Sequence, residues 1–118
     1  MTDYVFSIRD SNTMRKWIRP IAKCTRETLK GIDKALIPQD SLDTLYLCYS
    51  ILNTGHNTYI KLNMVEIRMV YKLLNGCQFC YKYTNCNNVD DKPEIKRRRN
   101  ELSDYLQELI LKEDFYNE

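Results

Sequence analysis

The residues with the clearest capacity for chemistry are three cysteines in one short stretch, Cys77, Cys80 and Cys86. Two thiolates separated by two residues can bind one Zn²⁺ from a tight turn, and a third thiolate close by can join them. A closed zinc site needs a fourth ligand, which would have to come through the tertiary fold from Cys24, Cys48 or His56. A strong zinc signature has two close pairs and this chain has one, so the alternative is that reduced cysteines anchor a loop. No other cofactor is expected.

Six basic residues between positions 15 and 34 are spaced three or four residues apart. On a helix that turns about 100° per residue, this spacing places them in one stripe, nearly opposite a stripe of apolar residues. Like charges at this spacing repel one another, so such a row is typical of a surface that binds nucleic-acid phosphate, an anionic membrane or an acidic protein. The alternative is a solvated face whose charges pair with acidic neighbours. The six residues are Arg15, Arg19, Lys23, Arg26, Lys30 and Lys34.

A second basic cluster occupies residues 96–99. Four adjacent positions on a helix point in four directions, so these side chains cannot form one stripe. We add Lys96, Arg97 and Arg99 to the candidate nucleic-acid-binding residues, and we expect Arg98 to lie near the apolar side with its stem over the core edge. If the helices that contain the two clusters are neighbours, the clusters form one basic surface.

The chain lacks the residue patterns on which most active sites depend. It has a single histidine, His56, and it contains no glycine-rich phosphate loop, no His-Glu-x-x-His motif and no Gly-x-Ser-x-Gly motif. The acidic pairs Asp40/Asp43 and Asp90/Asp91 stand at predicted helix starts, where capping explains them. We therefore expect a protein that binds and does not catalyse.

The first basic stripe must be positioned by a helix in the N-terminal third of the chain. Apolar residues recur at steps of three and four from Met14 to Leu36, which predicts a helix over that range. Residues 10–12 offer an N-cap, and Pro38 ends the run. Because Pro20 lies inside this helix, we expect a kink or a restart there.

Three further helices and two extended segments complete the prediction. Segments 4–8 and 58–62 favour extended structure. The chain is therefore predicted to be one all-α domain over residues 1–118, a compact bundle of about four helices with a short N-terminal extended arm and minor β-structure. The helices are expected over 42–53, from a capping box at 63–66 to residue 75, and over 92–112, with a cysteine-rich loop at 77–91.

Composition limits the class of protein and its compartment. The 118 residues are 43% hydrophobic and 29% charged, with a net charge of +2, which indicates a globular domain. The odd number of cysteines, 5, and the absence of a signal peptide predict an intracellular protein, cytoplasmic or nuclear and not secreted. No segment reaches the roughly 20 apolar residues of a transmembrane helix. Asn, Ile and Lys are abundant and alanine is scarce, which is typical of an A/T-rich genome and favours a viral origin.

Two functional hypotheses follow. The first is a small non-enzymatic binding protein that engages RNA, DNA or another polyanion, such as an acidic protein, through the basic helix face. The second is a protein–protein interaction module, for example a viral accessory or host-factor-binding protein or a homodimer, that uses exposed apolar residues. Membrane binding is disfavoured, because the apolar stripe opposite the basic one is needed for the core. The candidate apolar residues are Leu111, Phe115 and Tyr116.

Overall fold

The computed structural model describes residues 3–75 and 93–116. In these ranges the fold has four α-helices, one short 3₁₀ helix and one pair of short strands, which confirms the predicted all-α class with minor β-structure. The cysteine-rich loop at 77–91, with Cys77, Cys80 and Cys86, lies outside the described residues. The elements are β1 (Tyr4–Val5), α1 (Ile8–Leu29), η1 (Lys34–Leu36), α2 (Gln39–Leu52), β2 (Lys61–Leu62), α3 (Met64–Asn75) and α4 (Pro93–Tyr116).

Helix α1 begins earlier than the sequence pattern predicts. The Ser7 side chain accepts a hydrogen bond from the backbone N–H of Asp10 at 3.1 Å, so Ser7 is the N-cap and the predicted cap at 10–12 is wrong. The helix continues through Pro20, so the predicted restart at this residue is wrong. The earlier start adds residues 8–13 to α1, and Arg9 is one of them.

The C-terminal end of α1 also differs from the prediction. The helix ends at Leu29, and the chain then forms η1 as a separate element. The Asp33 side chain accepts a hydrogen bond from the backbone N–H of Ala35, which fixes a new helix start after Gly31 and Ile32. Lys34 therefore belongs to a different element from the rest of the predicted stripe.

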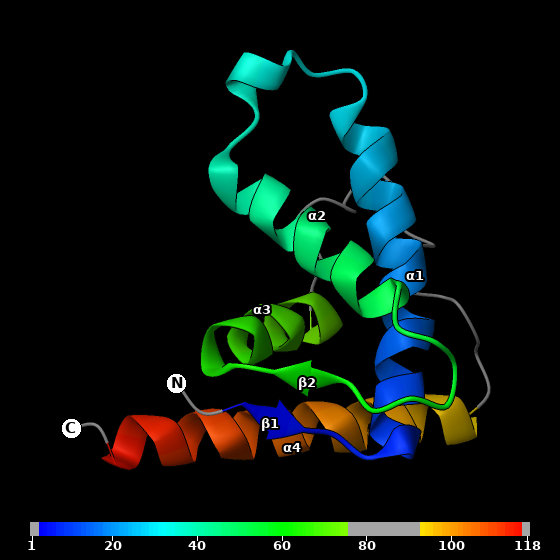
Figure 1. The fold of residues 1–118 in the computed structure, drawn as a ribbon, viewed down its shortest axis with the longest axis vertical. Helices are drawn as coiled ribbons and strands as arrows, with labels where there is room; N and C mark the ends of the chain where they lie inside the picture. Colours follow the sequence, from blue (N-terminus) through cyan, green and yellow to red (C-terminus); the bar gives the residue numbers. More distant parts are fainter. Residues whose placement is uncertain (1–2, 76–92, 117–118) are drawn as a thin grey trace.

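Helix α1 is the element against which the other helices pack. It stands along the long axis in Figure 1, with α2 inclined against it, α4 crossing its N-terminal end and α3 lying along α4. One continuous core joins all four helices, which explains why α1 has a buried apolar stripe over most of its length. The largest fully buried side chains include Trp17, Ile18 and Ile21 of α1, Ile51 of α2, Ile67 of α3 and Leu106 of α4.

The two predicted extended segments pair with each other. β1 and β2 are antiparallel, with Tyr4 opposite Leu62, and the backbone N–H of Phe6 donates to the Ile60 carbonyl at 2.9 Å. The capping box that precedes α3 is confirmed, because Asn63 and Glu66 exchange side-chain-to-backbone hydrogen bonds of 2.9 and 3.0 Å. Within residues 3–75 and 93–116, no helix is both long and apolar enough to cross a membrane.

Candidate anion-binding surface

Arg15 does not lie on the exposed stripe, because its side chain is only 4% exposed. Its guanidinium donates to the Thr54 hydroxyl at 2.9 Å, to the Asn12 side-chain oxygen at 2.7 Å, and to both the carbonyl and the hydroxyl of Thr58. Burial lowers the pKa of Arg15 through desolvation, but an arginine side chain remains protonated at neutral pH. The prediction of an exposed stripe that includes Arg15 is therefore wrong. The hydrogen bonds of Arg15 instead connect the segment before β2 to α1.

The exposed stripe on α1 is shorter than predicted at both ends. Lys34 is exposed but lies in η1, so the predicted stripe retains Arg19, Lys23, Arg26 and Lys30. Glu27 forms ion pairs with Arg26 at 3.8 Å and with Lys30 at 3.4 Å. Among the residues that the structure describes, Arg19 and Lys23 are exposed and have no ion pair.

Two further cations extend this stripe toward the N-terminal end of α1. Arg9 and Lys16 are exposed, and with Lys23 and Lys30 they are spaced seven residues apart. A seven-residue step brings a side chain back to within about 20° of the same face of a helix. Sequence reasoning missed both residues because it began the helix after Arg9 and followed only the steps of three and four. The seven-residue spacing was the signal that could have identified them.

In the second cluster, the expected roles of Arg98 and Arg99 are reversed. Arg99 donates two hydrogen bonds to the Leu74 carbonyl at the end of α3, at 3.1 and 2.5 Å, and its guanidinium lies 4.9 Å from the centre of the Trp17 ring. Arg98 is exposed and forms an ion pair with Glu94 at 2.9 Å. Helical register explains the reversal, because Arg99 follows the inward-facing Ile95 by four residues and precedes the buried Leu102 by three.

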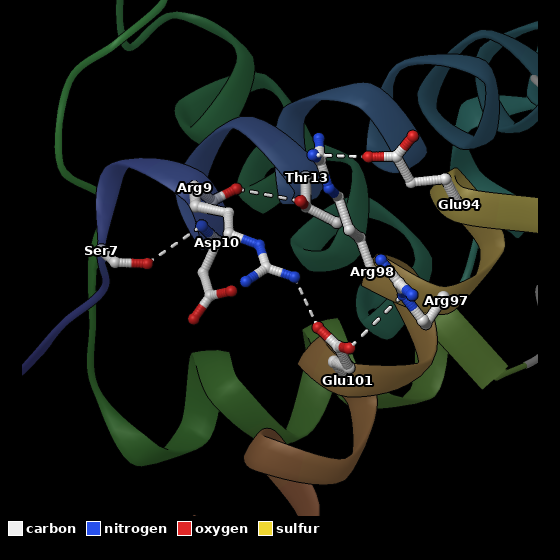
Figure 2. Close-up of polar contacts among 8 residues, drawn as sticks. All are labelled: Ser7, Arg9, Asp10, Thr13, Glu94, Arg97, Arg98 and Glu101. Atoms are coloured by element: carbon white, nitrogen blue, oxygen red, sulfur yellow. Dashed lines mark hydrogen bonds and ion pairs between the residues drawn. The ribbon is translucent and has the colours of Figure 1, made fainter.

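The two basic clusters are neighbours, because the N-terminal parts of α1 and α4 pack against each other. Figure 2 shows the ion pairs at this junction: Arg9 reaches across from α1 to Glu101 of α4, and Arg97 also contacts Glu101, at 3.8 Å. In the same view Arg98 extends from α4 toward Thr13 of α1 and contacts Glu94.

A groove of about 300 Å³ lies between the two helices at this junction. Helix α1 contributes Arg9, Asn12, Thr13, Lys16 and Trp17 to its lining. Helix α4 contributes Ile95 and Arg98. We call this the α1–α4 groove. Three of its seven lining residues are cations and none is acidic, so the groove itself favours an anion.

A second feature of the surface is apolar and lies at the other end of α4. Leu111, Phe115 and Tyr116 are 60%, 73% and 80% exposed, as expected for residues off the main apolar stripe. They line a shallow groove of about 380 Å³ together with polar and charged residues of the last turns of α4.

The cysteines and the histidine that the structure describes do not form a metal site. Cys24 is half-buried and Cys48 is buried, neither is in a disulfide bond, and His56 is exposed in the turn before β2. No group of three or more His, Cys, Asp or Glu side chains suited to a metal ion occurs in residues 3–75 and 93–116. Zinc binding by the cysteine-rich loop stays a prediction.

The chain matches no protein-family model, no curated protein and no solved structure. Function must therefore be inferred from the chemistry of the molecular surface.

Proposed function

We propose that this protein is a non-enzymatic binding protein that holds nucleic acid on a basic surface formed by α1 and the N-terminal part of α4. The observation that supports the proposal is an excess of cations where the two helices meet. The carboxylates of Glu27, Glu94 and Glu101 pair with cations of this surface, whereas Arg19 and Lys23 are exposed and form no ion pair within the described residues. The basic surface consists of Arg9, Lys16, Arg19, Lys23, Arg26, Lys30, Lys96, Arg97 and Arg98.

The shape of the surface favours a long polyanion. At about 1.5 Å per residue, the row from Arg9 to Lys30 extends roughly 31 Å along α1. Several successive phosphates of a nucleic acid can contact a row of that length at once, and each contact releases counterions. The ion pairs already present are exposed, so they are weak and can be exchanged for contacts with phosphate.

A membrane surface is a poorer partner for the same cations. Proteins that lie on anionic lipid insert apolar side chains beside their basic residues. The large apolar residues in the middle of α1, Met14, Trp17, Ile18 and Ile21, are all buried in the core. They are not available for insertion next to the basic surface.

A charge-reversal experiment tests the proposal. The triple variant Lys23→Glu, Arg26→Glu, Lys30→Glu should lower the affinity for fluorescently labelled RNA or DNA at low salt by at least about a hundredfold, because it removes three phosphate contacts and adds repulsion. The matched control is Lys34→Glu, Lys61→Glu, Lys72→Glu, which changes the net charge equally at exposed positions outside the basic surface. Equal losses in the two variants, or no binding by the unaltered protein, would contradict the proposal.

Protein–protein interaction is the second candidate function, and one observation favours it. Leu111, Phe115 and Tyr116 expose three large apolar side chains on the last two turns of α4. Exposed apolar patches of this kind mark interaction sites, including those between copies of one chain. Light scattering during size-exclusion chromatography tests the homodimer: a dimer that Phe115→Ser converts to a monomer supports it, and a monomer at every concentration contradicts it.

A further inference from the structure

The outer face of the C-terminal half of α4 exposes large apolar side chains beside charged ones. Asp104, Glu108, Leu111 and Phe115 follow one another at steps of four, three and four residues, and all four are exposed. This spacing places them along one side of the helix. The opposite side of the same segment is buried in the core through Leu106, so the outer face takes no part in the packing that forms the core.

The charges on this face are complementary to those of a second copy of the same face. Glu108 forms an ion pair with Lys112 at 3.2 Å, and both side chains are exposed. If two α4 helices pack antiparallel about a twofold axis near Ile110, position 108 of one copy stands opposite position 112 of the other. Each Glu108 then lies beside the Lys112 of the second copy, and the two pairs form a ring of four alternating charges.

The same register brings the apolar residues together. Leu111 is one residue from the axis, so it packs against Leu111 of the second copy. Phe115 stands opposite Tyr105, which is also exposed. Asp104 stands opposite Tyr116, whose hydroxyl can donate a hydrogen bond to the carboxylate. One register therefore satisfies the charges and the apolar side chains at once, as an interface between identical faces requires.

The shape of this face also suits a helix as its partner. All the residues that line its shallow groove of about 380 Å³ belong to α4, between Asp104 and Tyr116. Ridges of side chains on one helix pack into such grooves along another. At about 1.5 Å per residue, residues 104–116 extend about 18 Å. An interface of this length is expected to bury less than about 1,200 Å² in total, which is typical of weak association.

Self-association at this face leaves the basic surface accessible. In Figure 1 the C-terminal end of α4, drawn in red, lies away from the crossing of α4 with α1. The basic surface is formed at that crossing and along α1. Two copies joined by their C-terminal halves of α4 would therefore present two basic surfaces.

We propose that the protein forms a weak homodimer in which residues 104–116 of two α4 helices pack antiparallel. The inference rests on the second candidate function, because it names a second copy of the chain as the partner, and it does not depend on nucleic-acid binding. If the proposed nucleic-acid binding also holds, the dimer contacts one long strand at two places, and its affinity exceeds that of one copy.

Complementary charge reversals test the dimer and its register. The molar mass from light scattering should rise from one chain toward two as the unaltered protein is concentrated through the micromolar range. Glu108→Lys and Lys112→Glu should each weaken self-association at least about tenfold, because two symmetric contacts become repulsive. An equimolar mixture of the two variants should recover the dimer, because each copy then supplies the charge that the other has lost.

The matched control uses the other exposed ion pair with this spacing near the start of α4. Glu94 and Arg98 are also four residues apart and lie outside residues 104–116. Glu94→Lys and Arg98→Glu change the net charge by the same amounts and should leave self-association unchanged. Circular dichroism checks that all four variants are folded.

The outcomes separate this proposal from the others. A monomer at every concentration, or a dimer that the control variants weaken as much as Glu108→Lys and Lys112→Glu do, would overturn it. If Phe115→Ser dissociates the dimer but the mixture of charge variants does not recover it, the antiparallel register is wrong and the second candidate function stands. Because no nucleic acid is present, none of these results bears on nucleic-acid binding, which the anisotropy measurement tests by itself.

Discussion

Arg15 is a buried cation that donates all its hydrogen bonds to uncharged groups. It therefore does not belong to the exposed basic face of α1. Its partners Thr54 and Thr58 lie about forty residues away in sequence, in the connection between α2 and β2. Because the Arg15 side chain points into the protein, the exposed stripe on α1 consists of other cations. Arg9, Lys16, Lys23 and Lys30 follow one another in it at seven-residue steps.

Replacement of Arg15 should destabilise the fold. Arg15→Met removes four hydrogen bonds and releases the 54–58 connection from α1, so the free energy of unfolding should fall by about 1–3 kcal/mol. Urea denaturation followed by circular dichroism measures the loss. Arg19→Met is the control, because Arg19 is exposed one turn along the same helix, and it should change stability by less than about 0.5 kcal/mol. Equal effects of the two changes would contradict the structural role of Arg15.

At the scale of elements, the start of α1 determines whether Arg9 belongs to the basic surface. The Ser7 cap adds the turn that contains Arg9, and that turn brings Arg9 within 2.5 Å of Glu101 on α4. The earlier start thereby allows α1 and α4 to enclose the groove.

Loss of the Ser7 cap should therefore affect this end of the molecule. Ser7→Ala should lower the free energy of unfolding by about 1 kcal/mol, because the Asp10 N–H loses its acceptor. Ser50→Ala, at an exposed position inside α2, is the matched control and should be close to neutral. Thermal unfolding of both variants checks the difference, and a Ser7→Ala variant as stable as the control would show that the cap does not hold the first turn.

At the scale of the whole molecule, the features that could be predicted from the sequence are those that neighbouring residues in the chain determine. The helical class, the Asn63–Glu66 capping box and the two extended segments depend on residues close together in the chain. The burial of Arg15 was not predictable, because its acceptors come from a distant segment. The contact between α1 and α4 also depends on the tertiary fold, whereas the inward position of Arg99 was readable from its register with Leu102.

The central claim is that α1 and α4 together form one surface for a polyanion. Its most direct test is the slope of log affinity against log salt concentration for a labelled single strand, measured on the unaltered protein and on Lys16→Gln, Lys23→Gln, Arg98→Gln. The slope should be steep, about −3 to −6, and should become shallower by about 2 in the variant, because each of the three lost phosphate contacts removes about 0.7. A slope near zero, or one that the triple variant leaves unchanged, would contradict the claim.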